Sequence, residues 1–144
     1  MIADQLGLLL QRRVRRNLHA AVVQDVHPAV DLGAYPILSG VARYGGGVTA
    51  AALGTEIGVD RALVSRRAAE LVDAGLLAAH GDPQDRRRSL LTLTEEGEQV
   101  VERLRGRLVS AIDHRLSGWP ASDRKQLARL LTDFVSALGD DADS

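Results

Sequence analysis

Three consecutive arginines, Arg86, Arg87 and Arg88, stand in a short segment that also holds aspartate, proline and glutamine. Like charges this close repel one another, and the tip of a turn offers them little packing. A polyanion would relieve the repulsion, and phosphates or the electronegative minor groove of DNA are natural candidates. The alternative is a solvated turn in which the arginines pair with Asp82 and Asp85. The elements around this segment bear on that choice.

A helix predicted for residues 60–74 supplies a second basic group. It begins at an aspartate, a typical N-cap residue, and glycine follows its end. A helix whose N-terminal half lies in the major groove needs short and basic side chains, because arginine reads guanine with two hydrogen bonds and serine commonly holds a phosphate. The alternative is an ordinary solvent-facing helix. The first turns expose such side chains opposite the apolar face: Arg61, Ala62, Ser65 and Arg66.

A shorter helix is predicted immediately before this one, from Thr49 as N-cap to Ile57. Only residues 58–60 separate the two helices, so they cannot be coaxial, and a tight corner of this kind is typical of a helix-turn-helix. Two short apolar runs, residues 76–80 and 89–92, flank the arginine segment and predict a hairpin. The sequence therefore predicts a winged helix-turn-helix with the arginines at the tip of the wing.

Helical periodicity continues on both sides of this middle region. Apolar residues recur at helical spacing over residues 3–26, and a shorter helix fits residues 33–44. Thr94 opens a long helix that ends near Leu116, and a final amphipathic helix begins near residue 122. The predicted fold class is mainly α with a small β-hairpin wing: a winged helix-turn-helix with added N- and C-terminal helices.

The composition excludes several classes of protein. The chain has 144 residues, 45% hydrophobic and 26% charged, which suits one globular domain with helical extensions. Cysteine is absent and the four histidines show no metal-ligand spacing, so neither a metal site nor a cofactor is expected. No nucleophile elbow or phosphate-binding glycine loop is present, so an enzyme is not expected. Since no signal peptide or long apolar stretch is visible, we expect a cytoplasmic protein with no membrane partner.

The sequence resembles the MarR-type winged helix-turn-helix transcriptional regulators in two stretches. These read LGTEIGVDRALVSRRAAELVDAGLL over residues 53–77 and GDPQDRRRSLLTLTEEG over residues 81–97, and the flanking helices match the family's layout. The pattern Asp-x-Arg followed by Leu-Thr-x-x-Gly is specific for this family. The resemblance implies that Arg87 enters the minor groove and that Asp85 helps to orient it. It also implies that Ser65 and Arg66 face DNA while Val64 lies in the core. With the exposed and basic residues noted above, the predicted DNA-contact set is Arg61, Ala62, Ser65, Arg66, Arg67, Asp85, Arg86, Arg87 and Arg88.

Two residues depart from the family's pattern. Arg67 occupies a position that is usually apolar, so either its side chain extends to the DNA side or the helix packs differently. Gly54 replaces a usual alanine in the supporting helix, at a cost in helix propensity of about 1 kcal/mol.

The terminal helices carry more apolar side chains than one small domain can readily bury. A two-fold homodimer would cover them, and MarR-like proteins are dimers of this kind. We therefore assign residues 1–30 and 98–144 to dimerisation helices, and residues 31–97 to a DNA-binding lobe. The residues expected at the dimer interface are Leu6, Leu9, Leu10, Leu127, Leu130, Leu131, Phe134 and Leu138.

The sequence thus predicts a transcriptional regulator, most simply a repressor, that binds double-stranded DNA at a pseudo-palindromic operator as a homodimer. A small anionic or aromatic effector is expected between the DNA-binding lobe and the dimerisation helices, with Arg16, His19 and Tyr35 as candidate ligands. Two alternatives remain open. One is a helical-dimer protein-interaction module without specific DNA binding, and the other is a metal-responsive regulator.

Overall fold

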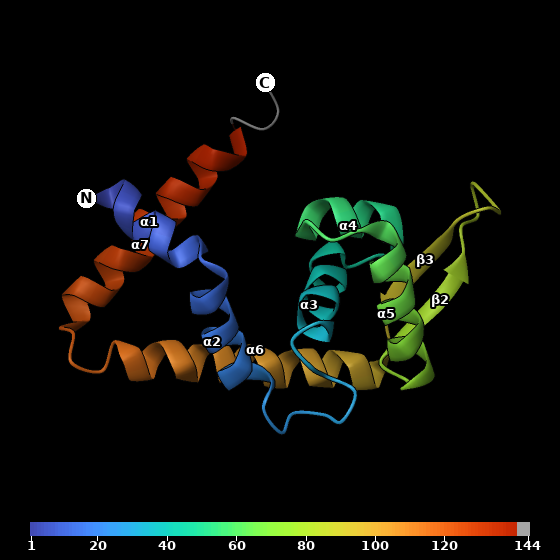
Figure 1. Ribbon diagram of the computed structural model, residues 1–144, viewed down its shortest axis with the longest axis horizontal. Coiled ribbons are helices and arrows are strands. Elements are labelled where there is room, and N and C mark those ends of the chain that lie inside the picture. Colours follow the sequence, from blue (N-terminus) through green and yellow to red (C-terminus); the bar gives the residue numbers. More distant parts are fainter. Residues whose placement is uncertain (141–144) are drawn as a thin grey trace. The chain divides into compact units, whose positions relative to one another are not determined.

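The computed structural model describes residues 1–140, which form seven helices and one three-stranded antiparallel sheet (Figure 1). The described chain divides into two compact units, one of residues 1–111 and one that begins at residue 112. The predicted fold, mainly α with a hairpin wing, is confirmed. No helix within residues 1–140 is both long enough and apolar enough to cross a membrane. The last four residues of the C-terminal segment assigned to dimerisation lie outside the described residues.

The elements follow one another in the order expected for a winged helix-turn-helix with additional helices. The last turn of α6 and all of α7 belong to the second unit. In chain order the elements are α1 (Ile2–Leu10), α2 (Arg12–Val23), α3 (Ala34–Tyr44), β1 (Val48–Thr49), α4 (Ala50–Ile57), α5 (Arg61–Asp73), β2 (Leu77–Gly81), β3 (Ser89–Leu93), α6 (Glu95–Arg115) and α7 (Ala121–Asp140).

Local capping defines the corner between α4 and α5. The Thr49 hydroxyl accepts a hydrogen bond from the Ala52 N–H at 3.1 Å, and Gly58 ends α4 in the left-handed region at φ 68°. The Asp60 carboxylate accepts from the N–H groups of Ala62 and Leu63 at 3.0 and 3.4 Å. Both helices therefore begin at the residues that the sequence predicts.

Gly54 has a structural reason that propensity alone does not reveal. Its carbonyl oxygen accepts a hydrogen bond from the Val59 N–H at 2.9 Å, across the corner between α4 and α5. A Cβ atom at position 54 would lie 2.6 Å from the Val59 carbonyl oxygen. The glycine thus allows the chain to pass close to α4, which offsets its cost in helix propensity.

The wing is a hairpin to which one short strand is added. β2 and β3 pair antiparallel from Leu77 opposite Leu93 to Gly81 opposite Ser89. The sheet order is β1-β3-β2, since the two residues of β1 pair with the middle of β3. The sequence does not predict β1, because a strand of two residues has no periodicity of its own and depends on its distant partner.

The prediction of one continuous N-terminal helix over residues 3–26 is wrong, because the structure has two helices, α1 and α2, in this segment. Gln11 is extended, with φ −61° and ψ 136°, and it separates α1 from α2. No glycine or proline stands at this break, so the local sequence contains no stop signal. α2 also ends at Val23, three residues before the predicted end, where Gln24 leaves the helical conformation and Asp25 turns the chain with a positive φ of 56°.

One hydrophobic core joins α2, α3, α4, α5, the sheet and the N-terminal half of α6. The apolar stripe of α6 is buried in this core as far as Leu104 and partly buried against it at Leu108, whereas Val109 and Ile112 are exposed. The largest fully buried side chains are Val22, Ile37, Leu38, Leu53, Val64, Leu71, Leu76, Leu77, Val100 and Leu104.

Candidate nucleic-acid interface

α5 presents a short and basic face to solvent. Val64, Ala68 and Leu71 are buried, and their spacing of three and four residues turns the opposite face of the helix outward. Four of the predicted DNA-binding residues lie on this outer face and are exposed: Arg61, Ala62, Ser65 and Arg66.

The turn of the wing is organised by Asp82 and Asp85. The Asp82 N–H donates to the Arg88 carbonyl oxygen at 3.0 Å, which closes the turn. The Asp82 carboxylate accepts from the Gln84 N–H at 2.9 Å, and the Asp85 carboxylate accepts from the Arg87 N–H at 3.0 Å. Asp85 therefore holds the backbone of Arg87 and leaves its guanidinium group available.

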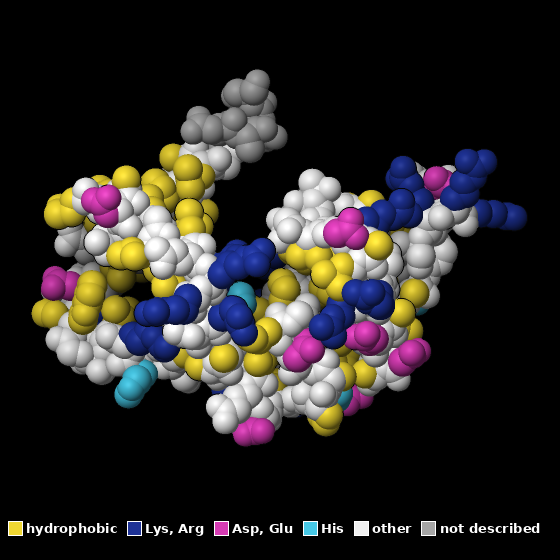
Figure 2. All heavy atoms as spheres, in the orientation of Figure 1, with side chains coloured by type: hydrophobic (Ala, Val, Ile, Leu, Met, Phe, Trp, Pro, Cys, Tyr) yellow, Lys and Arg dark blue, Asp and Glu magenta, His cyan; other side chains and the backbone are white. Residues whose placement is uncertain are grey.

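The wing arginines are only partly neutralised. Arg88 Nε lies 3.4 Å from Asp85 Oδ2. Among residues 1–140, no carboxylate forms an ion pair with Arg86 or Arg87. Figure 2 shows Lys and Arg side chains gathered around the end of the hairpin. Of the three wing arginines, only Arg88 therefore has the carboxylate partner that the solvated-turn alternative predicts.

A groove of about 500 Å³ brings the outer face of α5 together with the wing. It is lined by Arg61 and Ser65 from α5 and by Arg87, Arg88 and Ser89 from the wing. Sequence reasoning missed the floor of this groove, where Thr49 and three alanines of α4 (residues 50–52) leave space. The run of small residues at the start of the supporting helix was the available signal.

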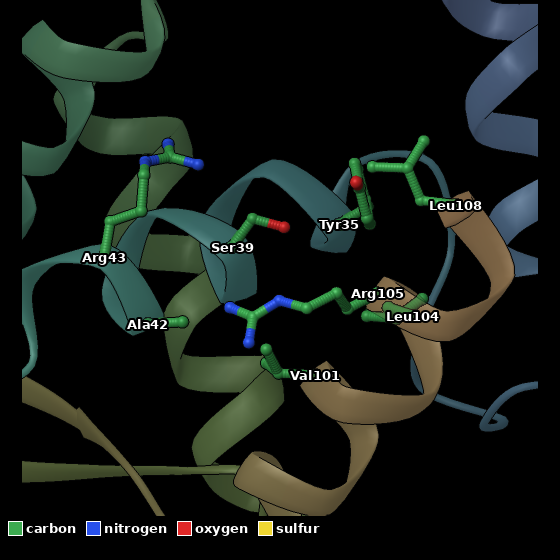
Figure 3. Close-up of a pocket in the computed structure, with 8 residues that line it drawn as sticks. All are labelled: Tyr35, Ser39, Ala42, Arg43, Val101, Leu104, Arg105 and Leu108. Carbon is green, nitrogen blue, oxygen red and sulfur yellow. The ribbon is translucent and has the colours of Figure 1, made fainter. Parts of the chain in front are cut away.

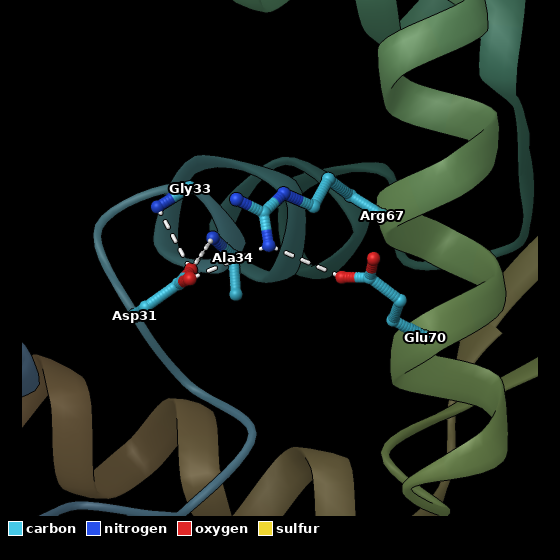
Figure 4. A network of polar contacts seen from close by, with 5 residues as sticks. All are labelled: Asp31, Gly33, Ala34, Arg67 and Glu70. Atoms are coloured by element: carbon cyan, nitrogen blue, oxygen red, sulfur yellow. Dashed lines mark hydrogen bonds and ion pairs between the residues drawn. The ribbon is translucent and has the colours of Figure 1, made fainter.

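Arg67 is directed away from this groove. Its Nη1 atom lies 3.3 Å from Asp31 Oδ2 and 3.1 Å from Glu70 Oε2. In Figure 4 its side chain reaches from α5 across the start of α3. The sequence raised two possibilities, and the structure shows a third arrangement, in which Arg67 pairs with two carboxylates of the protein at the edge of the buried face.

A second cavity, of about 250 Å³, lies between α3 and α6 (Figure 3). Val101, Leu104 and Leu108 of α6 form an apolar wall, and the Arg105 side chain extends from α6 toward α3. The residues contributed by α3 are Tyr35, Ser39, Ala42 and Arg43.

The three candidate effector residues occupy different positions around this cavity. Tyr35 lines it, and the His19 ring contacts the Tyr35 ring with 4.7 Å between centroids. Partial burial, together with the nearby Arg15 charge, lowers the pKa of His19 below its ordinary value. Arg16 is exposed on α2 and is not among the lining residues.

Each unit carries an exposed apolar face. In the first unit α1 buries none of its residues, and Leu9 and Leu10 are 58% and 72% exposed. In the second unit the apolar stripe of α7 is exposed as well, with Leu127 half-buried. Large exposed apolar patches usually mark an interaction surface. The exposed large side chains of α7 are Leu130, Leu131, Phe134, Val135 and Leu138.

Comparison with known proteins agrees with this architecture. Residues 25–88, from the segment that follows α2 to the wing, match the model of the MarR family. The chain is also similar to a MarR-family transcriptional regulator from Rhodococcus sp. RHA1, with 25% identity, a TM-score of 0.70, and coverage of 93% of this chain and 94% of that chain. Over residues 25–88 the chain is thus similar to the MarR family, and over nearly its whole length it is similar to solved MarR-family regulators.

Two further solved structures are similar to nearly the whole length of this chain. RV1404 from Mycobacterium tuberculosis is 26% identical with a TM-score of 0.77, covering 95% of this chain and 92% of that chain. CouR from Rhodococcus jostii RHA1, solved with bound p-coumaroyl-CoA, is 26% identical with a TM-score of 0.66, covering 93% and 94%. No curated protein sequence matches the chain. The resemblance predicted from the sequence is confirmed, and MarR-family proteins are transcriptional regulators and not enzymes.

Proposed function

We propose that this protein, like the MarR-family regulators that it resembles, represses transcription by binding a specific double-stranded DNA operator as a homodimer. The observation that supports it most strongly is the groove shared by α5 and the wing. Arg61 and Ser65 come from one side of this groove, and Arg87 and Arg88 from the other. Two basic elements that face the same space can contact adjacent grooves of one duplex.

In this proposal α5 enters the major groove and the wing follows the DNA backbone. Arg61 and Arg66 are the candidates for reading bases, because an arginine can make two hydrogen bonds to guanine, and Ser65 suits a phosphate. Arg87 extends into the neighbouring minor groove, where the negative potential is enhanced. The chain has a net charge of −1. Affinity must therefore come from these positioned contacts and from two copies acting together.

The homodimer is proposed to bury the exposed apolar faces of α1 and α7. A two-fold dimer would place its two α5 helices about 34 Å apart, one turn of DNA, and would therefore select a pseudo-palindromic site. A monomer would leave both apolar faces in water, at a cost of about 25 cal/mol per Å² of apolar surface.

A small-molecule effector is proposed to bind in the cavity between α3 and α6. The apolar side chains of Val101, Leu104 and Leu108 suit an aromatic ring. Arg105, whose Nη1 lies 2.8 Å from Glu102 Oε1, is the cation that would exchange this partner for an anionic group of the effector. CouR, which is similar to this chain, is bound to an aromatic acyl-CoA in its solved structure. The dimer could also adopt a form in which the two α5 helices are not one DNA turn apart. An effector that binds this form more tightly by about 1–3 kcal/mol would weaken DNA binding by several-fold to about a hundredfold.

The test is a fluorescence-anisotropy titration with DNA from immediately upstream of the protein's own gene, at two salt concentrations and with scrambled DNA as competitor. The proposal predicts tight binding that weakens steeply with salt, because each phosphate contact releases a counterion. It also predicts that the scrambled DNA competes poorly. Binding that is equal on both DNAs would contradict specificity for that site. No binding even at low salt would favour the protein-interaction alternative.

A further inference from the structure

Arg67 joins the recognition helix α5 to the segment that starts α3, across 36 residues of sequence. Its guanidinium Nη1 contacts a carboxylate on each side, Asp31 Oδ2 at 3.3 Å and Glu70 Oε2 at 3.1 Å. Glu70 belongs to α5 itself, three residues further on. The contact with Asp31 is the one that connects two elements (Figure 4).

Asp31 uses its two carboxylate oxygens for different purposes. Oδ1 accepts hydrogen bonds from the N–H groups of Gly33 and Ala34, at 3.0 and 2.9 Å, and so caps the first turn of α3. Oδ2 faces Arg67. The orientation of this carboxylate is therefore set by α3, and the position of the Arg67 guanidinium is set by the carboxylate.

Gly33 provides the surface on which the guanidinium lies. A Cβ atom at position 33 would be 3.1 Å from Arg67 Nη2 and 3.3 Å from its Cζ, closer than ordinary contact. The backbone of Gly33 has φ −79° and ψ −31°, a conformation open to any residue. Close approach of Arg67 is thus the feature of this position that a side chain would disturb.

On α5, Arg67 stands at the edge of the buried face, between Val64 and Ala68 on one side and the exposed Arg66 on the other. A rotation of α5 about its axis would move Arg66 and Ser65 relative to the wing, and it would also pull Arg67 away from Asp31. The close packing of Val64 and Ala68 fixes the buried face of α5, and the pair between Arg67 and Asp31 adds a further contact at the edge of that face. An ion pair with a capped carboxylate is directional.

We propose that Arg67 is a positioning residue for sequence recognition: through Asp31 it sets the rotation of α5 against α3, and it does not contact DNA. The proposal rests on the DNA-binding function proposed above. Arg67 acts through the geometry of Ser65 and Arg66, so its loss reduces discrimination between sequences and leaves the contacts with phosphates in place.

The experiment uses the full chain and a duplex that the wild-type protein selects from a random-sequence pool. Affinities for the selected and a scrambled duplex are measured by anisotropy at several salt concentrations, together with the melting temperature. Three variants interrupt the link in different ways: Arg67→Met removes the cation, Asp31→Asn removes the anion but keeps the capping oxygen, and Gly33→Ala displaces the guanidinium without changing charge.

Each variant is expected to bind the selected duplex about three- to tenfold more weakly, with unchanged affinity for scrambled DNA and an unchanged salt dependence. The melting temperature should barely move, because exposed ion pairs contribute little to stability. The double variant Arg67→Met/Asp31→Asn should lose no more than the larger single loss, since both changes break one link. Arg67→Lys should recover part of the discrimination.

Two controls match these variants. Arg129→Met breaks a comparable exposed ion pair on α7, where Arg129 Nη1 lies 3.2 Å from Asp133 Oδ2. Gly106→Ala adds a methyl group in open space on α6. Both should keep the wild-type preference for the selected duplex.

Three results would overturn the proposal. A salt dependence reduced by about one counterion for Arg67→Met would mean that Arg67 contacts a phosphate. Unchanged discrimination in all three variants would mean that the link does not position α5, and a parallel fall in melting temperature and in affinity for every duplex would mean general destabilisation. If the wild-type protein selects no sequence at all, the proposed DNA-binding function fails first, and that result is distinct from the other three.

Discussion

The Thr94 hydroxyl donates a hydrogen bond to the carbonyl oxygen of Gly75, with 2.6 Å between the two oxygens. The same hydroxyl accepts from the Gly97 N–H at 3.0 Å, as the cap of α6. The Thr94 N–H donates to the Leu76 carbonyl oxygen at 3.1 Å. One residue therefore ties the end of α5 to the start of α6, and the wing lies between them in sequence.

Thr94→Val should lower the free energy of unfolding by about 1–2 kcal/mol, because valine keeps the shape and loses both hydroxyl hydrogen bonds. Urea unfolding followed by circular dichroism measures the change. Thr132→Val is the matched control: its hydroxyl donates only to the Ala128 carbonyl oxygen on exposed α7, at 2.9 Å. A loss no greater than that of the control would show that the Thr94 cap contributes little.

Gly97→Ala should destabilise the protein by about 1–3 kcal/mol, because the added methyl group forces the backbone apart. A Cβ atom at position 97 would lie 2.0 Å from the Leu76 carbonyl oxygen, which belongs to the backbone and cannot move aside alone. Gly106→Ala on the same helix meets nothing within 4 Å and should stabilise by up to about 1 kcal/mol. Comparing the melting temperatures of the two variants separates the effect of packing at position 97 from the effect of helix propensity. Equal melting temperatures for Gly97→Ala and Gly106→Ala would contradict the packing argument.

Arg87→Ala should weaken binding to the specific duplex by about 1–3 kcal/mol and reduce its salt dependence by about one counterion. Its guanidinium has no ion-pair partner among residues 1–140, so removal should leave the melting temperature unchanged. Arg103→Ala, an exposed arginine on α6, removes the same charge away from the groove and should bind normally. Wild-type affinity of the Arg87 variant would contradict the role proposed for the wing.

Leu131→Asp should dissociate the proposed homodimer or cause aggregation, because it places a charge in the apolar stripe of α7. Leu131 is 48% exposed in the single chain. Sedimentation velocity measures the association state. Ser136→Asp adds the same charge on the opposite side of α7 and should leave the association state of the wild type unchanged. A dimer that survives Leu131→Asp would place the interface elsewhere.

The lowered pKa of His19 predicts a loss of stability in mild acid. Burial and the Arg15 charge disfavour protonated His19 in the folded state, so the unfolded state binds the proton more readily. Above pH 6.5, the ordinary pKa, His19 is neutral in both states and does not change the free energy of unfolding. As the pH falls through 6.5 toward the lowered pKa, the free energy of unfolding decreases, because only the unfolded state takes up the proton readily. Urea unfolding at pH 7.5 and 5.5 should show a smaller acid loss for His19→Gln than for the wild type. An equal decrease in the free energy of unfolding in both proteins would contradict the role of His19.

The helix-turn-helix and the wing could be predicted because their signals are local. Asp60 caps α5 through the N–H groups of residues two and three positions on, and Gly58 ends α4 because it tolerates positive φ. These contacts exist wherever the segment is placed. The break at Gln11 could not be predicted, because apolar periodicity continues across it without glycine or proline.

The order of the residues is enough to predict which side chains carry the charge, because the arginines of α5 and the wing occupy positions that any winged helix-turn-helix would expose. Which of these arginines remain available for DNA depends on how the elements pack together. Arg67 lies within 3.3 Å of Asp31, a residue 36 positions away, whereas Arg61 and Arg87 meet across a common groove. Spacing along one helix says which residues share a face, but the partner of a charged side chain depends on what another element places beside it.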